Sequence, residues 1–200
     1  MDCHLKMDEH VSQICRTAYY HLHNIRRVRH YITTEAAEML VHAFVTTKLD
    51  LNNALLYGIT EGLLDKVQRV QNTAARIVTR SSKYCRLTSL LRSLHWLPVR
   101  YRIQYKINLL TYKALNGLAP CYLADLIHKH IPSRDLRSST TYRLEVPLTK
   151  LVTVGDRAFS KSAPDLWNDL PLELQHSASL SSFMRQLKIH PFTKAYGDCT

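Results

Sequence analysis

The chain has 200 residues, of which 46% are hydrophobic, so it is long enough to bury a core without disulfides or metal ions. Only 5 glycines and 7 prolines occur, a composition that favours helices and argues against a β-sandwich or a disordered chain. The 27 lysines and arginines exceed the 16 aspartates and glutamates by 11, and such an excess points to a polyanionic partner if the charge is clustered.

The first 60 residues predict amphipathic helices. Apolar residues recur at helical spacing over residues 10–28, and Thr33-Thr34-Glu35 then supplies an N-cap for a second helix. A third helical stretch is expected from Leu49 to Tyr57, ending at Gly58. The outer face of the first helix carries Arg16, His21, Arg26, Arg27 and Arg29. The inner face of the second is expected to consist of Ala37, Leu40, Val41, Phe44 and Val45.

Residues 61–131 carry the clearest helical periods. The apolar spacing predicts a long helix over 61–79 and a short one over 84–94. Pro98 suits the first turn of another long helix, which Asn116-Gly117 closes as a C-cap. Pro120 can begin one more helix, reaching about residue 130.

The pattern changes after Pro132. Short runs of threonine, valine and tyrosine, divided by Pro147 and Gly155, indicate a small β-hairpin or irregular arm near 140–157. Helix signals then return: Ser162-Ala163-Pro164-Asp165 is expected to open one helix and Ser179-Leu180-Ser181-Ser182 the next. The sequence therefore predicts a mainly α helical bundle with an arm and C-terminal helices, in three segments, 1–60, 61–131 and 132–200.

The positive charge is concentrated in one quarter of the chain. From Asp65 to Lys113 there are eleven lysines and arginines against one acid. Because almost no acid is mixed in to form exposed salt bridges, nucleic acid is favoured over a merely solvated face. The following are predicted to share one helical face opposite the apolar stripe: Lys66, Arg69, Arg76, Arg80 and Lys83. The predicted nucleic-acid-binding residues are these five together with Arg86, Arg100, Arg102 and Lys106.

Aromatic residues are threaded through the same region, at Tyr84, Trp96, Tyr101, Tyr105 and Tyr112. Aromatic faces can stack bases while cations contact phosphates, a combination that suits a single strand or a hybrid duplex. At helical spacing such residues are more typical of a core, and core positions are expected. Trp96 and Trp167 are expected to anchor helices, with partners for their indole N–H groups. Arg100 and Arg102 are favoured phosphate contacts because a helix begins at Pro98 and helix N-termini attract anions.

No motif predicts catalysis, a cofactor or a metal. Cys3, His4, His10 and Cys15 follow no metal-ligand spacing, and the histidines at 128 and 130 would point to different sides of a helix. Asp156-Arg157 is expected to form a turn cap or ion pair. GxSxG, P-loop, GxGxxG and HExxH patterns are absent.

The cysteines and apolar runs bear on the compartment. Five cysteines at irregular gaps argue against a secreted disulfide framework. The first 16 residues lack a signal-peptide core, and no apolar run reaches the roughly 18 residues of a membrane span. We expect an intracellular protein, in the nucleus or cytoplasm, with no membrane partner.

Five stretches follow one another in a distinctive order. They are Leu55-Leu56-Tyr57-Gly58, 64–78 (LDKVQRVQNTAARIV), 94–102 (LHWLPVRYR), 110–120 (LTYKALNGLAP) and 155–171 (GDRAFSKSAPDLWNDLP). Together they resemble the region downstream of the palm in LINE-type (non-LTR) retrotransposon reverse transcriptases of the jockey and chicken-repeat-like clades. The resemblance covers roughly residues 8–192. One departure is LDLNN at 49–53, where the family often has a Tyr-Cys pair between the aspartate and the asparagine.

The resemblance implies that residues 63–117 belong to a thumb-like region that grips template and primer, followed by a C-terminal extension. Polymerisation needs acidic ligands for two metal ions, and the chain contains no Asp-Asp pair, so no polymerase activity is expected. We therefore predict a non-catalytic fragment of an RNA-directed DNA polymerase that binds RNA, DNA or their hybrid. The alternative is an inert or protein-binding remnant, in which an apolar face that normally packs on the missing palm promotes self-association.

Overall fold

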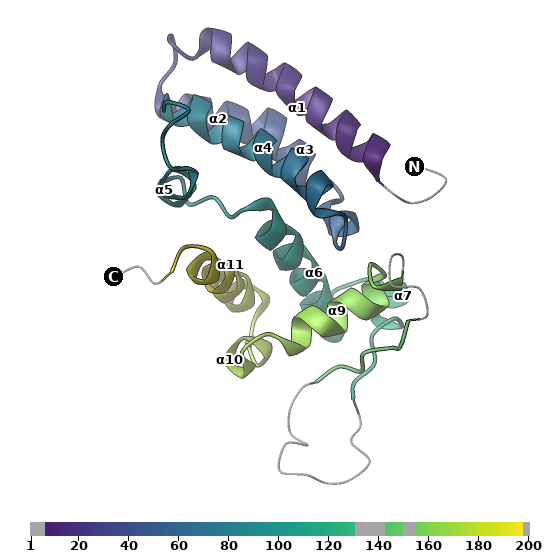
Figure 1. Ribbon diagram of the computed structural model, residues 1–200. Helices are drawn as coiled ribbons and strands as arrows, with labels where there is room; N and C mark the ends of the chain where they lie inside the picture. The colour runs from purple at the N-terminus through teal and green to yellow at the C-terminus, as the bar shows by residue number, and fades with distance from the viewer. Residues whose placement is uncertain (1–6, 131–142, 150–154, 198–200) are drawn as a thin grey trace. The chain divides into compact units, whose positions relative to one another are not determined.

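The computed structural model describes residues 7–130, 143–149 and 155–197 (Figure 1). These residues form helices joined by short loops and contain no strand, which confirms the prediction of a mainly α fold. The chain divides into two compact units, Met1–Ile103 with Ala195–Thr200, and Gln104–Lys194. The expected segments 1–60, 61–131 and 132–200 stay a prediction. None of the helices in the described part is long and apolar enough to cross a membrane.

The first unit is built around two long neighbouring helices, α1 and α4 (Figure 1). Its elements are α1 (Asp8–Val28), α2 (Thr34–Val41), the π-helical turn η1 (His42–Thr46), α3 (Thr47–Asp50), the 3-10 turn η2 (Asn53–Leu56), α4 (Glu61–Thr79), α5 (Leu87–Ser93) and the start of α6 (Val99–Leu115). The bounds of α4 agree with the predicted range. Gly117, with a φ of 68°, follows α6 as expected.

Apolar residues at helical spacing form the core between α1 and its neighbours. Val11, Ala18, Leu22 and Ile25 are buried on α1, and α4 contributes a matching stripe. The stripe on α4 consists of Leu63, Val67, Val70, Gln71, Ala74, Ala75 and Val78. Each buried leucine or valine stabilises the unit by about 1.5–3 kcal/mol, so this stripe determines which face of α4 is left for solvent.

Arg29 joins the C-terminal ends of α1 and α4. It follows the last residue of α1 and is buried, which corrects its predicted place on the outer face. Its guanidinium donates to the carbonyl oxygens of Ile77 (3.0 Å) and Val78 (2.7 Å), at the end of α4. Carbonyls in the last turn of a helix lack the usual donor four residues on, although that of Ile77 also accepts from the backbone N–H of Arg80 at 3.4 Å, and the helix dipole favours a cation there. In return, Arg80 donates from Nη2 to the carbonyl oxygen of Arg29 at 2.7 Å.

The second helix begins as predicted. Thr33 is the N-cap of α2, and its hydroxyl accepts a hydrogen bond from the backbone N–H of Ala36 at 3.2 Å. Ala37, Val41 and Val45 are buried as expected, but Phe44 is 46% exposed and its predicted core position was wrong. The π-helical turn η1 replaces the 3.6-residue period on which that position was predicted.

The expected helix from Leu49 to Tyr57 is broken. The α3 helix ends at Asp50, and Asn52 adopts a left-handed conformation with a φ of 57°, a conformation that Asn tolerates better than most residues. Only the single 3-10 turn η2 follows.

The second unit contains the rest of α6, α7 (Cys121–Ala124), α9 (Phe159–Asn168), α10 (Leu172–Gln175) and most of α11 (Leu180–Tyr196). Trp167, Phe183 and Tyr112 form its aromatic core: Phe183 stacks on Tyr112, with ring centroids 4.2 Å apart. The hydroxyl of Tyr112 donates to the carbonyl of Ser177 at 3.0 Å.

The helix starts of the second unit agree in part with the sequence. Ser179 caps α11, accepting from the N–H of Ser182 at 3.2 Å, as predicted. The α9 helix begins at Phe159, so Ser162-Ala163-Pro164-Asp165 lies inside the helix and was wrongly predicted to open it. Ser162, Ala163 and Pro164 are buried within α9.

The predicted arm can be followed only in part. Lys129 and Leu144 form an isolated antiparallel bridge, and the chain turns away from the helix after Ala124, so the helix expected up to residue 130 is short. The side-chain amide of Asn168 accepts a hydrogen bond from the backbone N–H of Leu144 and donates one to its carbonyl oxygen, both at 2.9 Å. Segments 131–142 and 150–154 of the expected arm lie outside the described residues.

Candidate nucleic-acid interface

The exposed face of α4 carries three of the predicted basic residues. Lys66 and Arg69 are exposed and Arg76 is half-buried, on the side opposite the apolar stripe. Because the spacing of these residues and of the buried ones follows the same helical period, burial of the stripe turns the cations outward.

The predicted basic residues after Arg76 lie beyond the end of α4. The α4 helix ends at Thr79 and Arg80 takes a left-handed conformation, so Lys83 lies in a loop and not on the predicted helical face. Arg76 Nη2 donates to the carbonyl oxygen of Lys83 at 3.2 Å. That bond holds the loop against the end of α4.

The loop between α4 and α5 presents an aromatic ring among cations. Tyr84 is 83% exposed, so its expected core position was wrong. Lys83 lies over the Tyr84 ring, with Nζ 5.1 Å from the centroid, and Arg86 is exposed at the start of α5. A ring that is exposed on one side and has a cation on the other can accept a base by stacking.

We call these residues the α4–α5 basic surface. It consists of Lys66, Arg69, Arg76, Arg80, Lys83 and Arg86, with Tyr84 among them. In the part of the chain that the structure describes, none of the six cations pairs with a carboxylate. Their positive charge is therefore available to an external anion.

Arg100 and Arg102 differ from the other predicted residues because both are paired with acids. Arg100 forms an ion pair with Glu61, and Arg102 a two-point ion pair with Asp50, in which Nε lies 2.9 Å from Oδ1. Asn53 also donates to Asp50 Oδ1, at 3.3 Å. Both guanidinium groups are thus paired with carboxylates in the free chain, and the preference for Arg100 and Arg102 as phosphate contacts stays a prediction.

Lys106, the last predicted residue, is exposed on α6 within the second unit. It contributes a cation to that unit and is not included in the α4–α5 basic surface.

Trp96 and Tyr112 are buried, as expected for core aromatics. Trp96 Nε1 donates to Glu38 Oε1 at 3.1 Å, which confirms the expected indole partner. The hydroxyl of Tyr196 donates to the carbonyl of Trp96 at 2.6 Å, and burial together with nearby Tyr101 raises the pKa of Tyr196 to about 12. Tyr101 and Tyr105 are half-buried, and burial raises the pKa of Tyr105.

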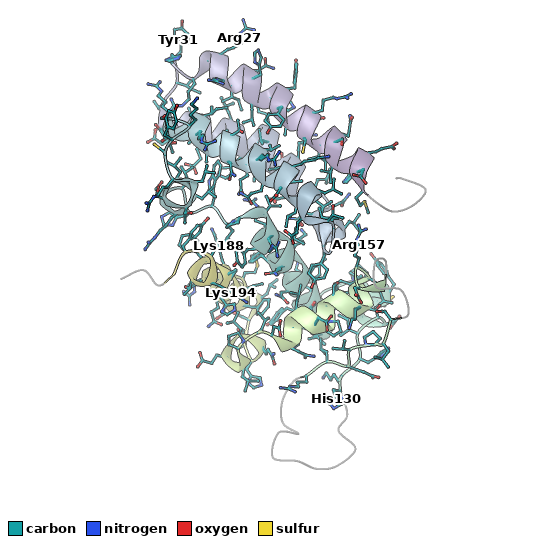
Figure 2. All side chains as sticks on the ribbon, viewed as in Figure 1. Arg27, Tyr31, His130, Arg157, Lys188 and Lys194 are labelled. Atoms are coloured by element: carbon teal, nitrogen blue, oxygen red, sulfur yellow. The ribbon has the colours of Figure 1, made fainter. Side chains whose placement is uncertain are left out.

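The structure also reveals basic and aromatic residues that were not included among the predicted binding residues. Arg16, Arg26 and Arg27 are exposed on α1, and Tyr20 lies between them. Arg27 and Tyr31 project outward at the C-terminal end of α1 (Figure 2). The signal was present in the sequence, because no acid occurs between Glu9 and Glu35.

Of the four residues weighed as metal ligands near the N-terminus, only His10 and Cys15 lie within the described residues. Within the described ranges there is no group of three histidine, cysteine or acidic side chains that could hold a metal ion. Cys15 is half-buried, and burial raises the pKa of its thiol although nearby Lys66 lowers it. Cys3 and His4 lie outside the described residues. Asp156 accepts a hydrogen bond from the hydroxyl of Thr149 at 2.8 Å, and the turn cap or ion pair expected at Asp156-Arg157 stays a prediction.

Comparison with known proteins finds no match: no family model, no curated protein and no solved structure is similar to this chain.

Proposed function

We propose that this chain is a non-catalytic helical region that binds RNA, DNA or their hybrid through the α4–α5 basic surface. The observation that carries the proposal is a set of six cations on α4 and the loop after it that have no carboxylate partner in the described part of the chain, with one exposed tyrosine in that loop. Phosphates attract such a group because binding releases the counterions condensed on the nucleic acid. The resemblance to the region after the palm of LINE-type reverse transcriptases supports the same assignment.

The proposal predicts a strong dependence of binding on salt. Fluorescence anisotropy of a labelled 20-nucleotide single strand, measured over a salt series, should give a log-log slope of about −4 for six phosphate contacts, at about 0.7 per contact. A hybrid duplex, with about 0.9 per contact, should give about −5. A slope near zero, or no binding at low salt, would remove the proposal.

Charge reversal tests which surface is responsible. Lys66, Arg69 and Arg86 are exposed and hold no backbone carbonyl, so their triple change to glutamate should abolish most binding while leaving the helices intact. Arg76 and Arg80 are less suitable because they bond to carbonyls of Lys83 and Arg29. The matched control reverses Arg185, Lys188 and Lys194, which are exposed on α11 and change the net charge equally (Figure 2). Equal losses in both variants would indicate an effect of total charge only.

The second candidate function is protein binding or self-association without a nucleic-acid role. Large apolar side chains are exposed in the first unit, at Met39 (66%), Leu51 (62%) and Leu55 (52%), and exposed apolar groups of this kind favour contact with another protein. Light scattering at low and high salt separates the candidates. Oligomers that persist at every salt concentration, in a protein that binds no nucleic acid, favour the second.

A further inference from the structure

The outer face of α1 combines cations with exposed tyrosines. Arg16 and Arg27 are exposed, and Tyr20, one turn after Arg16, is 65% exposed. These residues lie opposite the buried Val11, Ala18 and Leu22. Because the only acids on α1 are Asp8 and Glu9 in its first turn, this face carries uncompensated positive charge.

Tyr20 contacts one ring, which a second ring supports in turn. Tyr20 and His21 pack in a T-shaped arrangement, with centroids 5.5 Å apart, and His21 stacks on Phe44, with centroids 5.3 Å apart. Phe44 is on η1, where the π-helical turn leaves it 46% exposed. The three rings therefore form a supported platform whose outer members face solvent, so little side-chain entropy is lost when a flat ligand stacks on it.

Single-stranded nucleic acid is the ligand that this combination fits. Aromatic platforms beside cations take unstacked bases while the cations contact the backbone, whereas the bases of a duplex are already stacked on one another. An acidic membrane fits less well, because an interfacial helix must insert its apolar face, and the apolar face of α1 is buried in the core of the first unit.

We propose that Tyr20, His21 and Phe44, flanked by Arg16 and Arg27, form a stacking site for the bases of a single strand. This site rests on the proposed function and extends it beyond the α4–α5 basic surface. Arg80 of the α4–α5 basic surface donates to the backbone carbonyl of Arg29, two residues after Arg27, so both sites belong to the first unit.

The stacking test uses alanine and conservative variants of the platform. Tyr20→Ala should weaken binding of a 20-nucleotide oligouridine by about 5- to 150-fold, the range for loss of one stacked base, with the salt slope unchanged. Phe44→Ala should weaken it in the same direction, while Tyr20→Phe keeps the ring and should bind like the wild type. Tyr122→Ala, which removes a tyrosine 64% exposed on α7, is the matched control and should bind normally. Affinity for a blunt duplex should be unchanged in all four.

The charge test is separate. Arg16→Ala with Arg27→Ala should reduce the magnitude of the single-strand slope by about 1.4, for two contacts. If oligouridine binds the wild type and is lost on changing Lys66, Arg69 and Arg86, but Tyr20→Ala and Phe44→Ala bind normally, the α1 site is overturned and the proposed function stands. If the wild type binds no nucleic acid, the proposed function fails as well. Binding to phosphatidylserine vesicles that Tyr20→Ala abolishes, with oligouridine binding unchanged, would also overturn the site.

Discussion

Replacing Arg29 tests whether one buried guanidinium holds the ends of α1 and α4 together. Arg29 is 5% exposed and donates to the carbonyls of Ile32, Ile77 and Val78 and to the hydroxyl of Thr34, at 2.7–3.1 Å. Arg29→Ala removes this donor from all four acceptors, of which the carbonyl of Ile77 keeps the backbone N–H of Arg80. Each orphaned buried carbonyl costs about 1–3 kcal/mol, and loss of a cation at a helix C-terminus costs up to about 2 kcal/mol. Since such contributions are not additive and water can replace some bonds, we expect the free energy of unfolding to fall by about 3–4 kcal/mol.

The opposing effect is the desolvation of Arg29, which pairs with no carboxylate among the described residues. Arg29→Met gives the net of the two effects without a loss of packing, because it keeps the alkyl chain and removes both the charge and the donors. Urea unfolding is the assay. With an m-value of about 2 kcal/mol/M, a loss of 3–4 kcal/mol lowers the midpoint by about 1.5–2 M. If both variants unfold within about 0.5 kcal/mol of the wild type, the desolvation cost equals the gain from the hydrogen bonds and the reasoning is refuted.

Three further outcomes are expected. Thr33→Ala should lower the free energy of unfolding by about 1 kcal/mol through loss of the α2 cap, and an unchanged urea midpoint would contradict the capping role. A double-mutant cycle of Asp50→Ala and Arg102→Ala should give a coupling of about 1 kcal/mol, because the pair is only partly buried; zero coupling would show that the contact contributes nothing. The pKa of Tyr196 is raised to about 12 in the folded chain, against about 10 when unfolded, so its contribution is complete below pH 10 and is lost as the pH rises toward 12. Tyr196→Phe should flatten the alkaline loss of stability, and an identical pH profile would refute this assignment.

The sequence predicted correctly those helices whose apolar period and capping residues lie within the helix itself. The α4 helix has the predicted bounds because its apolar residues repeat over five turns, and Thr33 and Ser179 cap their helices because a cap needs only the following few residues. The exposed cations of α4 follow from the same period. Predictions failed where backbone conformation departed from that period, at the π-helical turn before Phe44 and at Asn52.

The candidate site depended more on tertiary structure. The charge of a stretch rich in Lys and Arg is enough to predict a polyanionic partner. Which of its cations are free to contact that partner depends on acids that are remote in the chain. Arg102 pairs with Asp50, 52 residues away, whereas Lys66 and Arg69 pair with no acid among the described residues. Hydrophobic periodicity depends on residues that are neighbours in the chain, and charge pairing depends on which helices pack together. The sequence alone therefore predicted most of the helices and their basic character, and the tertiary contacts decided which positive charges remain for a partner.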